Sequence, residues 1–161
     1  MNETELKIRT IGDPVLRKKT KPVKQVTAEH KRMLSLMSRL MYESSGIGLA
    51  APQVGLDISM IVVDIGKGLY KLINPRIVKK EGRQAIEEGC LSCPGISVKV
   101  KRAKKVTVQA LDEDGRPVVV DAENMLACVM QHEIDHLLGK LIVDYVPMWK
   151  KALLGKKIKN L

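Results

Sequence analysis

Two histidines stand four residues apart in the segment His132-Glu133-Ile134-Asp135-His136. On a helix this spacing places both imidazoles on one face, about one turn apart, where they can share one divalent ion at roughly 2.0–2.1 Å each. Glu133 lies at the flank of that face, where a carboxylate can take a proton from metal-bound water and return it to a leaving amine. The alternative is a surface helix that carries two of the chain's 3 histidines by chance. The pattern predicts a metal-dependent hydrolase.

A third ligand has to come from another part of the chain, and the 3 cysteines are the candidates. Cys128, His132 and His136 would form a line about 12 Å long at 1.5 Å per residue. Three side chains strung out so far cannot comfortably converge on one ion, so Cys128 is better interpreted as an apolar pocket or core residue. Cys90 follows Gly89, which allows close approach, and a thiolate beside a divalent ion stays deprotonated. A Cys-His-His set leaves one tetrahedral position open, which is the catalytic arrangement.

Cys93 offers an alternative to this open site. Together with Cys90, His132 and His136 it could form a closed structural zinc site. The separation between Cys93 and His132 is far too long for a compact finger, although a larger site could tolerate it. A closed site would leave Glu133 without a role. Replacing Cys93 with Ser discriminates between the two, because loss of the metal would reject the open site.

Three helices have to position or accompany these residues. Thr27 is a plausible N-cap for the first, and Asp121 a plausible N-cap for the second, which Gly139 ends. The third is a short, basic, amphipathic helix. The expected helices span about residues 28–44, 122–138 and 148–161.

Short apolar stretches between turn signals indicate strands. Asp114-Gly115 predicts a hairpin turn, residues 1–26 read as an irregular arm, and segment 46–53 reads as a loop. Strands and helices do not alternate strictly. We therefore expect an α+β fold, in which antiparallel strands pack around a central helix carrying the metal motif, in a single domain over residues 1–161. The expected strands span 58–63, 70–73, 77–79, 84–88, 96–100, 106–111 and 117–120.

The composition limits the partners. Phe is absent and aromatic residues total 2%, so the core must use Val, Ile, Leu and Met, and recognition of nucleic-acid sequence by base stacking is not expected. The formal charge of +10 favours acidic partners such as nucleic acid, a ribosome surface or anionic lipid, although lysines on solvated faces are the preferred explanation. The first residues lack the apolar core of a signal peptide, and no run is long enough to span a membrane. A cytoplasmic location with reduced thiols is expected.

Three segments, taken together, resemble the peptide deformylase family. Residues 46–53 are similar to its first motif, a Gly-x-Gly-x-Ala-Ala-x-Gln loop. Residues 88–92 are similar to its second motif, Glu-Gly-Cys-Leu-Ser, and residues 132–136 to its third, a His-Glu-x-x-His segment with Asp before the last His. Residues 12–17 resemble the family's usual opening. The order and spacing also match, so the resemblance covers most of the chain and suits the compact subgroup with a C-terminal helix.

The resemblance implies hydrolysis of the N-formyl group from the N-terminal formyl-methionine of newly synthesised peptides, with release of formate. It implies Glu133 as the general acid/base. It also implies that the side-chain amide of Gln53 and the backbone N–H of Leu91 stabilise the tetrahedral oxyanion, a role that suits fixed neutral donors. One divalent ion is implied, commonly Fe(II), with Zn, Ni or Co as substitutes. Its implied ligands are Cys90, His132 and His136.

The resemblance further implies that the substrate backbone binds as an added strand to Ile47, Gly48 and Gly89. Taken alone, the two glycines of segment 46–53 could be no more than a loop after a helix, and Gln53 could merely satisfy backbone groups there. Cys93 stands where family members often have an aliphatic residue. The residues implied to line the methionine side-chain pocket are Ile86, Met125, Cys128 and Val129.

Two other functions remain open on the residues alone. The first is a small peptidase of the His-Glu-x-x-His type, against which Gln53 and Cys90 argue because such peptidases usually complete the site with His or Glu. The second is a non-enzymatic binding module with structural zinc. The basic helix over 148–161 could dock an enzyme of emerging peptides near the ribosomal exit, or could simply pack on the domain.

Overall fold

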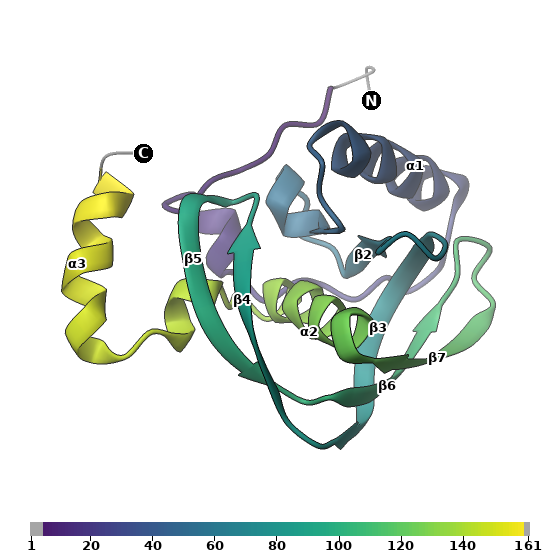
Figure 1. The fold of residues 1–161 in the computed structure, drawn as a ribbon. Helices are drawn as coiled ribbons and strands as arrows, with labels where there is room; N and C mark the ends of the chain where they lie inside the picture. The colour runs from purple at the N-terminus through teal and green to yellow at the C-terminus, as the bar shows by residue number, and fades with distance from the viewer. Residues whose placement is uncertain (1–4, 160–161) are drawn as a thin grey trace.

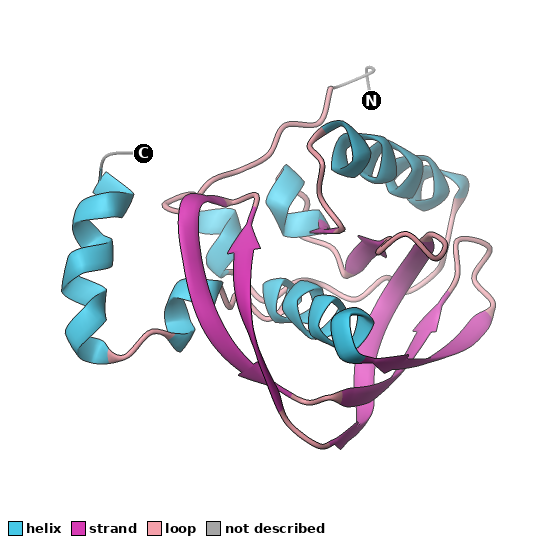
Figure 2. Ribbon diagram, in the orientation of Figure 1, coloured by secondary structure: helices cyan, strands magenta, loops and turns pink. Residues whose placement is uncertain are grey.

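The computed structural model describes residues 5–159, with side chains up to residue 156. It is a mixed α+β fold with antiparallel strands, as predicted (Figures 1 and 2). The strands are β1 (Gly48–Ala50), β2 (Met60–Val63), β3 (Tyr70–Glu81), β4 (Gln84–Cys90), β5 (Cys93–Arg102), β6 (Lys105–Leu111) and β7 (Pro117–Glu123). The helices are α1 (Ala28–Glu43), α2 (Asn124–Leu137) and α3 (Met148–Lys159), with single 3-10 turns at η1 (Pro14–Arg17), η2 (Ala51–Val54) and η3 (Ile142–Tyr145).

The strands form a five-stranded sheet and a separate hairpin. The order in the sheet is β1-β2-β3-β6-β7, and every neighbouring pair is antiparallel. Between β3 and β6 the chain leaves the sheet to make the β4–β5 hairpin, which arches beside α2 in Figure 1. Helix α2 therefore has the sheet on one side and the hairpin close to another.

Helix α2 contains residues 132–136 and packs against the sheet. Its buried residues Ala127, Met130, Ile134 and Leu137 recur at helical spacing and join the cluster formed by Ile61, Val63, Leu72 and Val108. This stripe holds the helix on the sheet by burial of apolar surface. The face that carries the two histidines is left to meet the hairpin.

Segment 46–53 is not the plain loop that the sequence indicated. Gly48, Leu49 and Ala50 pair with Val63, Val62 and Ile61 as strand β1, and residues 51–54 form the turn η2. The prediction was wrong because this pairing joins segments more than ten residues apart, which local glycine and proline signals do not reveal.

Several strand predictions were wrong in their boundaries. Residues 70–81 form one long strand where two short ones were expected, because register shifts absorb Asn74, whose φ is 52°, and the following Pro75. Strand β7 runs on to Glu123, so Asp121 lies in the strand and accepts a hydrogen bond from Thr107 instead of capping α2. The hairpin strands β4 and β5 are also longer than expected.

The helix ends follow the sequence closely elsewhere. Thr27 is the N-cap of α1, with its backbone N–H donating to His30 Nδ1 at 3.0 Å. Gly139 follows α2 with a φ of 76°, as a helix stop requires. The predicted arm is irregular apart from η1 and a single bridge between Lys21 and Ile58, and its residues 1–4 lie outside the described residues.

Helix α3 projects from the body beyond the hairpin (Figure 1). Met148 is 84% exposed and Trp149 71% exposed, and Leu154 is half-buried against the cluster beneath the hairpin. Residues 160–161 of the predicted helix, and the side chains of residues 157–159, lie outside the described residues. Among the helices described, none is long and apolar enough to cross a bilayer.

Candidate metal centre

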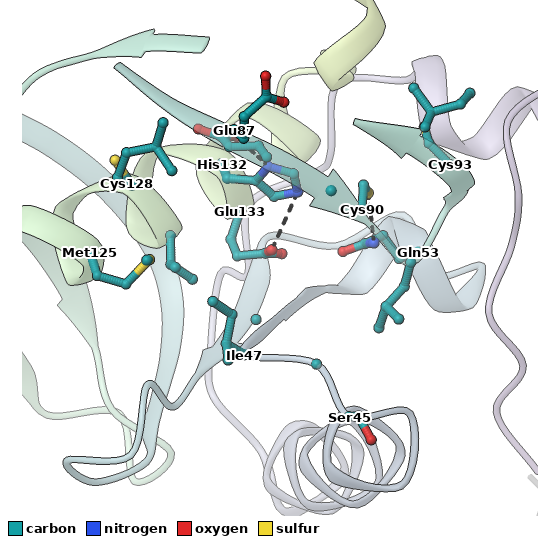
Figure 3. Close-up of a pocket in the computed structure, with 18 of the residues that line it drawn as sticks. Ser45, Ile47, Gln53, Glu87, Cys90, Cys93, Met125, Cys128, His132 and Glu133 are labelled. Atoms are coloured by element: carbon teal, nitrogen blue, oxygen red, sulfur yellow. Dashed lines mark hydrogen bonds and ion pairs between the residues drawn. The ribbon is translucent and has the colours of Figure 1, made fainter. Parts of the chain in front are cut away.

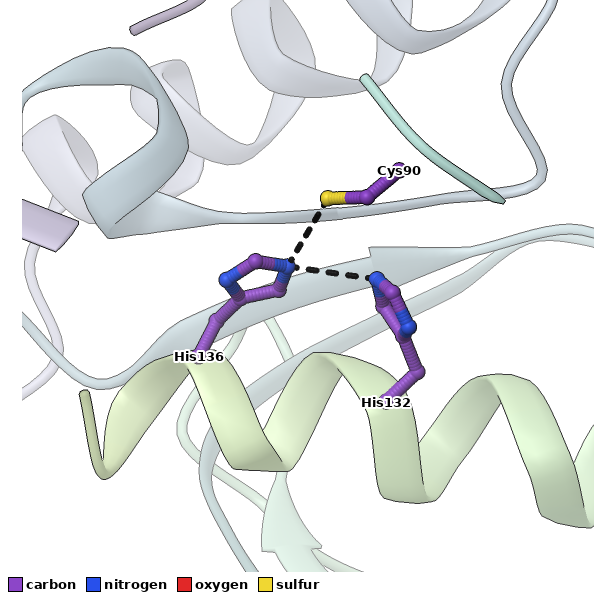
Figure 4. A group of neighbouring side chains, drawn as sticks. All are labelled: Cys90, His132 and His136. Carbon is purple, nitrogen blue, oxygen red and sulfur yellow. Dashed lines mark hydrogen bonds between the residues drawn. The ribbon is translucent and has the colours of Figure 1, made fainter. Parts of the chain in front are cut away.

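Three donor atoms from α2 and from the end of β4 converge on one point (Figure 4). His136 Nε2 lies 3.2 Å from His132 Nε2 and 3.4 Å from Cys90 Sγ, and all three atoms lie within 4.8 Å of one another. A tetrahedral ion at about 2.0–2.1 Å from nitrogen and about 2.3 Å from sulfur separates its ligands by roughly 3.3–3.6 Å. The donor set and its spacing therefore fit one divalent ion.

The orientation of His132 is set by an acidic residue on the hairpin. Glu88 Oε1 lies 2.9 Å from His132 Nδ1, so a hydrogen bond from Nδ1–H leaves the Nε2 lone pair facing Cys90 and His136. Glu88 is itself held by Arg102, whose Nε and Nη2 donate to it at 2.5 and 2.8 Å. A carboxylate behind a histidine in this way is the usual support of a metal-binding imidazole.

The electrostatics of the cluster favour a cation among these donors. Burial holds the pKa of His136 well below its usual range, so its imidazole is neutral. Burial opposes a charge on His132, yet hydrogen bonds to Cys90 and Glu88 raise its pKa to about 10. The hydrogen bond with Cys93, followed by burial, raises the pKa of the Cys90 thiol. A divalent ion supplies the positive charge that stabilises a thiolate there.

Glu133 lies beside the histidines and is almost completely buried, at 3% exposed. Its Oε1 is 3.7 Å from His132 Nε2, and its Oε2 has no hydrogen-bond partner among the described residues. Burial raises the pKa of this carboxyl to about 7. Such a group can both accept and return a proton near neutral pH.

Gln53 faces the same point from the opposite wall, and Figure 3 shows its amide and the Glu133 carboxylate directed toward one another. Gln53 Oε1 accepts a hydrogen bond from the backbone N–H of Ala50 at 2.9 Å. This leaves Nε2 pointing at Cys90 Sγ, 3.5 Å away, and at Ser92 Oγ, 3.2 Å away. Gln53 thus satisfies a backbone group with its oxygen and presents its N–H groups to the site.

A pocket of about 530 Å³ opens onto this cluster (Figure 3). His136, which is 1% exposed, lies beneath its floor and is the single predicted site residue outside its lining. The structure therefore brings the predicted residues together around one cavity. Those that line it are Ile47, Gly48, Gln53, Ile86, Gly89, Cys90, Leu91, Met125, Cys128, Val129, His132 and Glu133.

The two other cysteines lie outside the ligand cluster. Cys93 and Cys128 are both buried and both line the pocket, but neither belongs to the His/Cys/Asp/Glu group that the described residues bring together. This arrangement supports the open Cys-His-His site over the closed one. Cys93 nevertheless lies directly opposite Cys90 in the β4–β5 ladder.

Sequence reasoning missed the network behind the histidines. Arg102 Nη1 donates to Asp135 Oδ2 at 2.9 Å, and the Tyr145 hydroxyl donates to the same oxygen at 2.5 Å. Glu88 and Asp135 stand within the motifs, but their pairing with Arg102 depends on the folded chain. The pocket-lining residues that were also missed are Ser45, Gly46, Glu87, Glu88, Cys93, Gly95 and Ile96.

Comparisons with known proteins agree with the motifs. The family model described as polypeptide deformylase matches residues 5–152. A peptide deformylase of Halothermothrix orenii is 52% identical over 143 residues, which cover 88% of this chain and 93% of that protein. The crystal structure of a peptide deformylase from Legionella pneumophila superimposes with a TM-score of 0.92 at 41% identity, covering 98% of this chain and 95% of that one. That of the Synechococcus elongatus enzyme, in complex with actinonin, gives 0.91 at 38% identity, covering 99% and 88%.

Proposed function

This chain belongs to the peptide deformylase family of hydrolases, and we propose that it removes the N-formyl group from the N-terminal formyl-methionine of newly synthesised peptides by metal-dependent hydrolysis, releasing formate. The observation that carries the proposal is the convergence of three donor atoms within 4.8 Å beside a buried carboxyl and a fixed amide. In this proposal residues 1–161 form one catalytic domain, and α2 is its central helix, carrying the metal motif.

Cys90, His132 and His136 would hold one divalent ion, Fe(II) in the cell, with Zn, Ni or Co as substitutes. The ion would supply a Lewis acid that lowers the pKa of a water molecule at its open position. Glu133 would accept the proton of that water and return it to the leaving amine, which its raised pKa supports. Because Glu133 lies at the cluster yet stands outside the ligand group, it has room for this role.

The oxyanion would form between Gln53 Nε2 and the backbone N–H of Leu91. The hydrogen bond from Ala50 fixes the Gln53 amide before substrate arrives, so little reorganisation is needed when charge develops. Leu91 follows Cys90 in the turn of the hairpin, which places its backbone beside the same ligand.

The substrate backbone would lie along the pocket rim and bond to Ile47, Gly48 and Gly89 as an added strand. The methionine side chain would enter the part of the pocket that α2 and β4 enclose. Cys128 and Val129 are buried there and Met125 is 44% exposed at its mouth, which supports an apolar subsite open at one end. Its lining residues would be Ile86, Met125, Cys128 and Val129.

An assay of formate release from a formyl-Met peptide, beside its acetyl counterpart, tests the proposal. We expect release from the formyl peptide alone, and a loss of kcat of about 10²–10⁴-fold in the Glu133→Gln variant with its metal content unchanged. The Glu43→Gln variant makes the same change at an exposed position at the end of α1, outside the pocket, and serves as the matched control. Metal-loaded protein that releases no formate would reject the proposal.

Helix α3 would bring the enzyme, working in the cytoplasm, to its substrate at the ribosome. Lys150, Lys151 and Lys156 are exposed, and the exposure of Met148 and Trp149 argues against a helix buried on the domain. We expect salt-sensitive ribosome binding that is lost when residues 148–161 are deleted, while formate release from a short peptide persists. Binding unchanged by the deletion would reject this part of the proposal.

A further inference from the structure

Cys90 and Cys93 are the two thiols of a C-x-x-C turn, and they lie next to each other across the hairpin. They are opposed partners in the antiparallel β4–β5 ladder, which closes through Leu91 and Ser92. Opposed residues of an antiparallel pair have Cα atoms roughly 4.5–5.5 Å apart, within the range of about 4.4–6.8 Å that a disulfide requires. The opposed positions of the pair therefore meet the Cα spacing that a disulfide requires.

The turn between the two cysteines is held firmly on both sides. The backbone carbonyl of Ser92 accepts a hydrogen bond from the backbone N–H of Ile11 at 2.8 Å, and its hydroxyl accepts one from Gln53 at 3.2 Å. These bonds fix the turn that holds Cys90 and Cys93 opposite each other.

The two thiols differ in access. Both cysteines line the pocket, but Cys90 is partly exposed there, where a small oxidant reaches its sulfur. Cys93 is 1% exposed and packs in the apolar cluster of the hairpin with Leu16, Val98 and Leu141. A thiol so shielded reacts with a sulfur already oxidised beside it, rather than with an oxidant from solvent. It is placed as the resolving partner of Cys90.

From this geometry we infer that Cys90 and Cys93 form a reversible redox modification site, which closes to a disulfide when a hydroperoxide reaches the metal-free protein. The sulfur of the Cys90 thiol attacks one oxygen of hydrogen peroxide, the O–O bond breaks, and the thiol proton leaves with the departing hydroxide as water, so that a sulfenic acid forms. The Cys93 thiol then attacks that sulfur, the S–S bond forms, and the sulfenic oxygen leaves as a second water. With hydrogen peroxide, two thiols and one peroxide give one disulfide and two waters.

The bridge would protect Cys90 from irreversible oxidation. This inference rests on the proposed role of Cys90 as a metal ligand. A bridged Cys90 cannot bind the ion as a thiolate, so the protein is inactive while oxidised. The bridge also removes the sulfenic acid before it proceeds to sulfinic acid, which simple thiols do not reverse. Thiol–disulfide exchange with a dithiol then restores both cysteines and the ligand set.

Mass analysis of tryptic peptides after peroxide treatment of the metal-free full chain tests this inference. Cleavage after Arg83 and Lys99 isolates residues 84–99, which contain Cys90 and Cys93, and leaves Cys128 in another peptide. We expect peptide 84–99 to become lighter by two hydrogen atoms, two of the 3 thiols to be lost, and the zinc stoichiometry reached when zinc is then added to be lower than in untreated protein. Dithiothreitol should reverse all three changes.

Variants at Cys93 and Cys128 separate the bridge from other oxidation. Cys93→Ser should gain oxygen on peptide 84–99, with no recovery by dithiothreitol, and Cys93→Ala covers the case in which a buried serine disturbs folding. Cys128→Ser should behave as the parent chain. Wild-type peptide 84–99 that gains oxygen irreversibly, or a bridge that includes Cys128, would overturn the inference. If the disulfide forms in a protein that neither binds metal nor releases formate, the proposed function is rejected and the disulfide inference stands.

Discussion

The carboxylate of Glu88 lies 2.9 Å from His132 Nδ1 and joins the hairpin to the helix that carries the histidines. The same carboxylate receives two hydrogen bonds from the buried Arg102. Arg102 continues the link to Asp135, one residue before His136. The helix that carries His132 and His136 is thus held from the hairpin side by a chain of charged groups.

Replacing Glu88 with Gln should weaken metal binding. The amide keeps the shape of the side chain but removes the charge that orients His132 and balances Arg102, so metal affinity should fall about 10–100-fold. Competition with a chromophoric chelator measures this change. The matched variant Glu87→Gln, which alters the neighbouring exposed carboxylate, should keep the parent affinity. Equal affinities in both variants would show that Glu88 does not orient the ligand.

Gly48→Ala should displace Glu133. A Cβ at residue 48 would stand 2.8 Å from Glu133 Oε1 and 2.9 Å from Val129 Cγ1, closer than such atoms approach in proteins. Since misplacement of a catalytic group by about 1 Å can lower the rate 10²-fold, we expect a kcat loss of about that size with metal content intact. Gly155→Ala, which meets nothing within 4 Å, should leave kcat unchanged. A normal kcat in Gly48→Ala would contradict the placement of Glu133.

Gly139→Ala should lower the stability of the whole domain. The residue has a φ of 76°, which costs alanine about 1–2 kcal/mol, and its Cβ would stand 2.6 Å from the carbonyl oxygen of Arg17. Thermal unfolding should show a Tm lowered by several degrees. Gly115→Ala has a similar φ of 80° and a looser neighbour, Val26 at 3.3 Å, so its Tm should fall less. Equal shifts would show that the contact with Arg17 adds nothing.

Val129→Ala should relax the choice of N-terminal residue. Val129 lines the pocket and is 7% exposed, so removing two methyl groups enlarges the apolar subsite. The ratio of kcat/KM for formyl-Met over formyl-Phe peptides should fall about 10-fold or more, the size expected for small changes in an apolar pocket. Val119→Ala, on the exposed side of β7, is the control and should keep the parent ratio. An unaltered kcat/KM ratio in Val129→Ala would show that Val129 does not line the subsite of the N-terminal side chain.

The site followed from the sequence wherever local geometry decided the outcome. The rise of a helix excludes Cys128 as a ligand beside His132 and His136, and the structure leaves Cys128 outside the ligand group. The β1 strand could not be predicted, because Gly48 becomes a strand residue only when Val63 pairs with it. The ion pairs of Arg102 with Glu88 and Asp135 could not be predicted for the same reason. Three residues far apart in sequence become neighbours only after the hairpin folds onto α2.

The place of the β4–β5 hairpin in the chain has a consequence for the order of folding. The hairpin is inserted in the chain between β3 and β6, which are neighbours in the sheet. The sheet and α2 can therefore associate before the hairpin packs against them. Packing the hairpin against α2 closes a loop of the chain, which costs conformational entropy. Cys90 and Glu88 belong to the hairpin, whereas His132 and His136 belong to α2. The three candidate donor atoms are therefore brought together only when the hairpin has closed onto α2.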